Sequence, residues 1–162
     1  MSENSCVKAL EEASNILSSA GFPVTVKDGV LTSFFAVENS KMVFAYTAEC
    51  TGPNMVEANA GVKGFEEEAS DLECETVLQI IKKLLAIPNE YTITIAMEED
   101  MILFYYPPTE DSKAYTYVGT TFALSVSLAG WLSQAVEAAR KEEPIPEFRA
   151  EIESGPSDGK RD

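Results

Sequence analysis

The chain has 162 residues, with 27 acidic and 12 basic side chains, a formal net charge of −15 and no histidine. This length fits one domain, and its apolar content is enough to build a core. The charge argues against direct binding of a nucleic-acid backbone or an anionic membrane, because both need a basic surface. Without histidine the chain lacks the commonest general base and metal ligand, so a binding protein, chaperone or structural module is favoured.

The N-terminal residues contain no basic stretch followed by an apolar core, so they do not resemble a secretory signal. No run of about 18 apolar residues is present, and no membrane span is expected. The dispersed cysteines Cys6, Cys50 and Cys74 do not form a disulfide framework and are interpreted as buried thiols. Together these features predict a cytoplasmic protein.

The first part of the chain is predicted to form one helix and three strands. Apolar residues at spacings of three and four place residues 5–20 in an amphipathic helix. Asp28-Gly29 favours a tight hairpin turn between the first two strands. The third strand alternates with a period of two and is apolar on both faces, which is typical of a covered strand. The strands cover residues 23–27, 30–38 and 41–50.

The middle of the chain is predicted to be a loop followed by a helix. Residues 51–69 are irregular and are interpreted as a loop with a short turn or an extra strand near residues 55–58. Ser70 and Glu73 have the spacing of a capping box, which predicts a helix from there to Ile87.

The last part is predicted to contain a strand pair over residues 91–97 and 101–106, and a helix over residues 121–141. Residues 114–118 are interpreted as another strand or an extended lead-in. From residue 142 the chain is polar, acidic and broken by proline, which predicts a disordered tail.

The predicted fold is therefore a single α+β domain over residues 1–141 and an acidic tail over residues 142–162. Its order is helix, three antiparallel strands, helix, two to three strands, helix, with one twisted antiparallel sheet packed by helices. The folded part holds 20 acidic and 9 basic residues, a net charge of −11, so most of the acidity belongs to the domain.

No catalytic, metal or cofactor site is predicted. Nucleophile pairs that use histidine are impossible here, and the scattered cysteines lack the spacing of zinc ligands. The acidic clusters at residues 66–68 and 98–100 lack the spacing of a calcium loop and are interpreted as a solvated face and a solvated turn. Residues 34–35 and 102–106 are apolar at consecutive positions, so either helices cover both sheet faces or apolar surface is left for a partner.

The element order resembles the class I type III secretion chaperones, the CesT/SycE group. The features that carry this resemblance are the Asp28-Gly29 hairpin, the apolar stripe from Val77 to Leu85 and the strands from Tyr91 to Tyr106. The YbjN-like proteins, which are similar in fold, are the nearest rival. The resemblance implies a cytosolic homodimer that binds an extended segment of a secreted effector protein across apolar patches, without chemistry or cofactor.

The resemblance also implies where the contacts lie. Partner-binding residues are expected on the first helix and the early strands: Val7, Leu31, Phe35, Phe44 and Tyr46. Dimer-interface residues are expected on the second helix and the late strands: Val77, Ile81, Leu84, Tyr91 and Ile93. For each of these residues the alternative is packing inside the core.

Three other functions compete with the chaperone. The first is a YbjN-like regulatory or adaptor protein that binds a folded partner. The second is an acidic immunity or inhibitor protein that covers a basic enzyme. The third is an enzyme that uses carboxylates, although no pair of acidic residues stands out.

Overall fold

The computed structural model describes residues 2–87 and 92–149. The strands are β1 (Val24–Lys27), β2 (Val30–Ala36), β3 (Val43–Thr51), β4 (Met55–Lys63), β5 (Thr94–Glu98), β6 (Met101–Tyr105) and β7 (Thr109–Glu110). The helices are α1 (Ser2–Ser19), α2 (Phe65–Glu68), α3 (Cys74–Ala86) and α4 (Ala114–Arg140), with a short 3-10 helix η2 (Asp111–Lys113) before α4.

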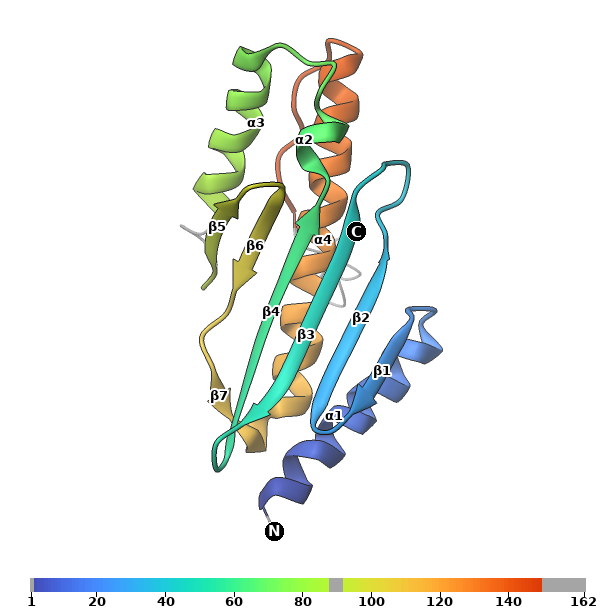
Figure 1. Ribbon diagram of the computed structural model, residues 1–162, viewed down its shortest axis with the longest axis vertical. Coiled ribbons are helices and arrows are strands. Elements are labelled where there is room, and N and C mark those ends of the chain that lie inside the picture. The colour runs from blue at the N-terminus through green and yellow to red at the C-terminus, as the bar shows by residue number, and fades with distance from the viewer. Residues whose placement is uncertain (1, 88–91, 150–162) are drawn as a thin grey trace, which may run out of the picture.

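All the strands belong to one antiparallel sheet with the order β1-β2-β3-β4-β6-β5, and β7 adds to the end of β4. The sheet is open, with β1 and β5 at its edges (Figure 1). The predicted α+β class, with one antiparallel sheet packed by helices, is confirmed.

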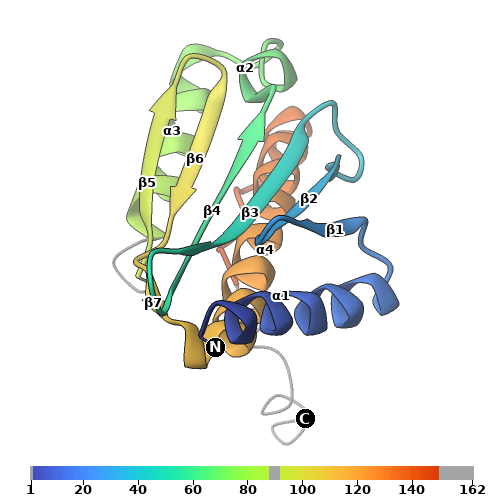
Figure 2. The ribbon, with the colours of Figure 1, turned by 60° about the horizontal axis from the view of Figure 1, so that its bottom comes forward.

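The helices lie on one face of this sheet (Figures 1 and 2). The long helix α4 packs along β3 and β4, α1 packs on β1 and β2, and α3 packs against α4. Side chains on the covered face are buried, whereas the next residue along each strand points away from the helices. Among the residues that the structure describes, helices cover only one face of the sheet, which we call the closed face, and we call the other the open face.

An aromatic cluster fills the centre of the closed face. The ring of Phe122 on α4 meets Phe22, Phe44 and Tyr46 edge to face, with centroids 5.0, 6.0 and 5.1 Å away. The quadrupoles of aromatic rings favour this edge-to-face arrangement. The cluster joins α4 to β3 and to the segment that follows α1.

Two buried tyrosines fix the position of α4 along the sheet. The hydroxyl of Tyr46 is 2.7 Å from Oγ1 of Thr121, and that of Tyr106 is 2.5 Å from Oγ of Ser125. Burial raises the pKa of both tyrosines far above its ordinary value, because the phenolate would lose its hydration. These polar pairs are directional, so they specify one register of α4 more sharply than apolar contacts alone.

The strand β4 replaces most of the predicted loop. Its inward residues Val56, Ala58, Ala60 and Val62 are buried, and its outward residues are mainly polar. The small residues Ala58 and Ala60 leave room for α4 to lie close to the centre of the sheet. The interpretation of residues 51–69 as mainly loop was wrong because alanine and glycine have low strand propensity and hid a clear alternation.

The predicted capping box does not form. The helix α3 begins after Glu73, and the hydroxyl of Ser70 donates to the carbonyl of Glu67 instead. The cluster at residues 66–68 is only partly a solvated face, since Glu68 in α2 is buried. The cluster at residues 98–100 does lie at the β5–β6 turn, as predicted.

Residues 114–118, for which a strand was one interpretation, form the first turns of α4. Ala114 and Val118 are buried there at helical spacing. The hydroxyl of Tyr117 donates to the carbonyl of Pro107 and accepts from the backbone N–H of Ala58. These two bonds tie the start of the helix to the sheet.

The interpretation of all three cysteines as buried thiols is wrong. Cys6 of α1 and Cys50 of β3 form a disulfide, and the free thiol of Cys74 is exposed at the start of α3. The two bonded cysteines are 44 residues apart, and only the fold brings them together.

The first part of the segment predicted to be a disordered tail, up to residue 149, is packed against the domain. The segment after α4 packs against α3 and α4, with Ile145 and Phe148 against the core. The indole Nε1–H of Trp131 donates to the carbonyl of Pro146 at 2.8 Å. Residues 150–162 lie outside the described part of the chain.

Candidate partner-binding face

The open face of the sheet carries an apolar row across its middle. Phe34, Ala45, Gly61 and Leu103 are cross-strand neighbours on β2, β3, β4 and β6. The outward positions beside this row are mixed: Val43, Met101 and Tyr105 are apolar or aromatic, whereas Thr47, Asn59 and Lys63 are polar. We define the open-face patch as this row together with Val43, Met101 and Tyr105.

The side chains of this patch are exposed to different degrees. Phe34 has 70% of its surface exposed and Tyr105 has 42%. Val43, Ala45, Met101 and Leu103 are half-buried. Contiguous apolar surface of this kind, away from the core, is typical of a binding site.

A hollow of about 450 Å³ lies within the patch, between Phe34 and Met101. Its floor is Gly61, where a Cβ atom would come within 3.1 Å of the side chains of Leu103 and Met101. The side chains of Leu103 and Met101 therefore fill the space that a side chain at this position would take, and they lie close over β4. Charged residues line it at one end, namely Lys41, Lys63, Glu67 and Asp100.

At the opposite end of the open face, two glutamates lie directly across from each other. Glu49 of β3 pairs with Glu57 of β4, and both are exposed. Within the described residues, neither glutamate forms an ion pair. The open face therefore has an apolar middle and a negatively charged end.

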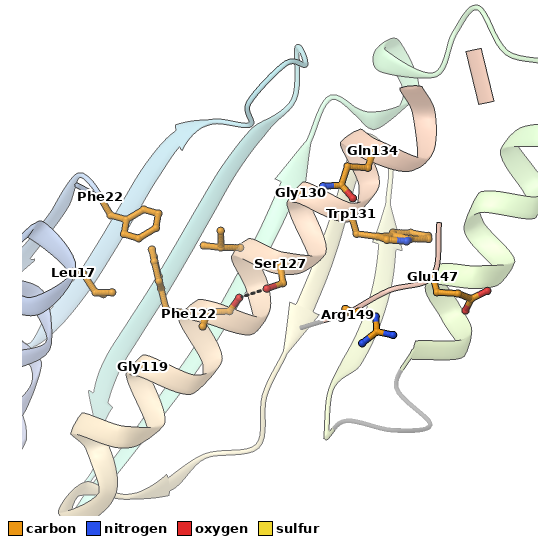
Figure 3. Close-up of a pocket in the computed structure, with 12 residues that line it drawn as sticks. Leu17, Phe22, Gly119, Phe122, Ser127, Gly130, Trp131, Gln134, Glu147 and Arg149 are labelled. Atoms are coloured by element: carbon orange, nitrogen blue, oxygen red, sulfur yellow. Dashed lines mark hydrogen bonds between the residues drawn. The ribbon is translucent and has the colours of Figure 1, made fainter. Parts of the chain in front are cut away.

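A second hollow, of about 710 Å³, lies on the helix layer (Figure 3). Its floor is α4, with Gly119 and Gly130 among the small residues that make it shallow. Leu17 and Phe22 form one side, and Trp131 and Arg149 lie toward the other.

This groove has both apolar and polar lining. Phe122 and Trp131, its largest apolar residues besides Phe22, are mostly buried. Gln134, Glu147 and Arg149 make one side polar. We take the open-face patch as the candidate for binding a partner because it holds Phe34, the most exposed large apolar side chain among the described residues.

The structure places three of the five expected partner-binding residues in the core. Leu31, Phe44 and Tyr46 are buried on the closed face, where α1 and α4 cover them. Val7 and Phe35 are half-buried, and Phe35 stacks against Phe44 with centroids 4.9 Å apart. Val7 lies on α1, whereas the other four residues lie on β2 and β3, and the five do not form a common surface.

The expected dimer-interface residues differ in burial. Leu84 and Ile93 are buried in the core, whereas Val77 and Ile81 are half-buried and pack against it. Tyr91 lies outside the described residues. The most exposed apolar side chains of α3 are instead Leu78 and Leu85, on the adjacent face of the helix.

Sequence reasoning missed Phe34, the most exposed large apolar residue of the described chain. Phe34 and Phe35 are adjacent and equally apolar, so hydrophobicity alone could not say which points inward. The sequence pattern also misleads here, because Ser33 is polar and yet is buried on the closed face, where it donates to the carbonyl of Pro23 at 2.8 Å. Leu31, Ser33 and Phe35 share one face of β2, which leaves Phe34 on the other.

Among the residues that the structure describes, no helix is both long and apolar enough to cross a membrane. Within the same residues, no three side chains of the metal-binding types come together as a metal site. No protein-family model matches this chain, and neither a curated protein nor a solved structure does so.

Proposed function

We propose that this chain is a protein-binding domain without catalytic chemistry, and that its open-face patch holds an apolar segment of a partner protein. The observation that carries this proposal is the exposure of Phe34 beside the hollow over Gly61. Exposing an apolar row across four strands to water is unfavourable in free energy. Covering a phenylalanine side chain is worth about 2–3 kcal/mol.

The form of the patch suits an apolar side chain of a partner. Gly61 is one of the residues that line the hollow, together with the apolar side chains of Phe34, Val43, Ala45 and Met101. A side chain that enters the hollow would contact the backbone of β4 and the flanking apolar side chains at once. Sites of this kind, where an anchor fills a pocket among apolar neighbours, supply most of the free energy of protein recognition.

The chaperone function implied by the resemblance is one version of this proposal. In that version the partner is an extended segment of a secreted effector, and the chain acts in the cytoplasm. The structure departs from the order on which the resemblance rests, because four strands rather than three precede the second long helix. A YbjN-like adaptor that binds a folded partner therefore remains the alternative within the same proposal.

The homodimer is a second part of the proposal, and the exposed residues of α3 support it. Leu78 and Leu85 are 57% and 48% exposed, and their spacing of seven residues places them on one face. A two-fold contact between copies of α3 would cover both. Leu78→Glu with Leu85→Glu should give a monomer in sedimentation equilibrium, and an unchanged mass would contradict this interface.

A site-specific photo-crosslinker tests the partner-binding proposal. We would place benzoyl-phenylalanine at Phe34 and, in a matched control, at Ile16, which is 56% exposed on α1. In the native cells, position 34 should give a discrete protein adduct and position 16 should not. Adducts at neither position, or at position 16 alone, would contradict the open face as the binding site.

The adduct also distinguishes the versions of the proposal. Peptide mapping of the crosslinked partner locates the attached residue. An attachment within an extended N-terminal segment of a secreted protein supports the chaperone. An attachment on a folded domain supports the adaptor.

A further inference from the structure

We infer that the partner of the open face is basic, with a lysine or arginine that contacts Glu49 and Glu57 while an apolar side chain occupies the hollow over Gly61. This inference rests on the proposed function and adds the chemistry of the partner. It begins from the acidic end of the open face, which the proposed function does not use.

The pairing of Glu49 with Glu57 is unfavourable in the free domain. The two residues are directly opposite on neighbouring antiparallel strands, so their Cβ atoms are about 5 Å apart. Like charges at such positions destabilise a sheet. A cation from a partner placed between the two carboxylates would remove this repulsion and gain two charge-assisted hydrogen bonds.

Within the described residues, no ion pair supplies this cation. Lys27 lies in the same row, but Val30 separates it from Glu49, which makes it two strands or about 10 Å away. Lys41 and Lys63 line the hollow at the other end of the open face. None of the ion pairs within the described residues joins these lysines to Glu49 or Glu57.

The register fixes the separation of the two contacts. Gly61 and Glu57 lie on the same face of β4, four residues apart, which corresponds to about 13 Å along the strand. An extended segment that runs along β4 would match this separation with an apolar residue and a basic residue four positions apart. The intervening row, Thr47 and Asn59, offers polar contacts between them.

The proposed contact between two copies of the chain uses α3, where Leu78 and Leu85 are exposed, so the open face is left for a different protein. The chain carries a net charge of −15, which repels an acidic partner at the open face. A basic partner is attracted over the same distance, and this attraction raises its association rate. The negative charge of the domain therefore favours a basic partner.

Labelled peptides test this inference. The probe is a nine-residue extended peptide with alternating threonine, one central phenylalanine and a lysine four positions after it, and its control has glutamate instead of lysine. Fluorescence anisotropy measures both affinities at low and moderate salt. We expect the lysine peptide to bind at least fivefold more tightly, and salt to reduce the difference.

Two double variants assign the effect to residues. Glu49→Gln with Glu57→Gln should abolish the preference for lysine, whereas Glu11→Gln with Glu12→Gln, an equal charge change on exposed positions of α1, should keep it. Equal affinity of the wild-type chain for both peptides, or equal loss in both double variants, would overturn the inference.

Phe34→Ser distinguishes this inference from the proposed function. Loss of both peptides in Phe34→Ser, with no effect of the glutamine changes at positions 49 and 57, would keep the open face as the binding site but refute the basic partner. Unchanged binding of both peptides in Phe34→Ser would refute the proposed function itself. A concentration-dependent dimer that Phe34→Ser abolishes would assign the face to a second copy and overturn the inference.

Discussion

Glu68 of α2 and Arg140 at the end of α4 form an ion pair, with Oε2 and Nη1 3.3 Å apart, although 72 residues separate them in sequence. Glu68 is buried, with 5% of its side chain exposed, and its Oε1 also accepts from the backbone N–H of Lys41 at 2.7 Å. Arg140 contacts Asp71 at 3.0 Å and donates to the carbonyl of Glu68. This cluster joins the β2–β3 loop, α2 and α4.

Removing the cation from this cluster should be costly. Arg140→Met leaves the carboxylate of Glu68 buried without its counter-charge, and we expect unfolding to require about 2 kcal/mol less. Lys141→Met, an exposed neighbour that contacts Glu137, is the control and should change stability by less than about 0.5 kcal/mol. Urea denaturation of both variants measures the difference, and equal midpoints would refute a structural role for the pair.

The buried tyrosines predict instability at alkaline pH. Their pKa values are raised in the folded chain, whereas an unfolded tyrosine ionises near pH 10, so their contribution is complete below pH 10 and falls as the pH rises above it. Each tyrosine should add a slope of up to about 1.4 kcal/mol per pH unit.

The change Tyr46→Phe separates this slope from other alkaline effects. It removes one ionisable group while the ring stays in the aromatic cluster, so the stability profile between pH 10 and 11.5 should become flatter. At neutral pH the variant should lose about 1 kcal/mol, because Thr121 loses a partner. Tyr115→Phe, at an exposed position, is the control. Parallel profiles for wild type and Tyr46→Phe would contradict the assignment.

The disulfide between Cys6 and Cys50 predicts a thiol count. Protein taken from native cells under acid quench should show one reactive thiol, that of Cys74. Disulfide bonds persist mainly in oxidising compartments. Three reactive thiols would therefore contradict a disulfide in native cells and would agree with the cytoplasmic location that the sequence predicts. In purified oxidised protein, reduction should lower stability by about 4 kcal/mol, since the bond closes a loop of 44 residues. Thermal melts with and without reductant measure this loss.

The same substitution at Phe34 and at Phe44 should have very different effects on stability. Phe34→Ser should leave the free energy of unfolding within about 0.5 kcal/mol of wild type, because the ring is mostly in water. Phe44→Ser should cost about 4 kcal/mol or prevent folding, because it leaves a cavity and a buried hydroxyl beneath α4. Circular dichroism and urea titration check both. A large loss for Phe34→Ser would place that residue in the core.

The helices and strands with strong periodicity could be predicted from the sequence, whereas strands that depend on pairing with distant segments could not. The hairpin at Asp28-Gly29 and the strand pair β5–β6 follow from local signals and are present in the structure. The strand β4 escaped detection because Ala58, Ala60 and Gly61 favour neither strand nor loop strongly enough to decide. Its strand conformation depends on pairing with β3 and β6, which is long-range information.

The candidate site was harder to predict than the fold for a related reason. The sequence shows that residues 34 and 35 are both apolar, and correctly suggests that one face of the sheet might keep apolar surface. It does not show which faces α1 and α4 cover. Leu31, Phe44 and Tyr46, which were expected to bind a partner, are in the core because α1 and α4 pack on that face of β2 and β3, and this packing is long-range information.

The placement of the helices on one side has a consequence for how the sequence can vary. Along β3 and β4, from Val43 to Lys63, the even-numbered residues from Phe44 to Cys50 and from Val56 to Val62 face the helices, and the odd-numbered residues face outward. Amino-acid substitutions at even positions are limited by the volume available beneath α4. Substitutions at odd positions are limited only by the partner that binds the open face. Related chains that exchange one partner for another should therefore differ at odd positions of these two strands while their even positions stay nearly constant.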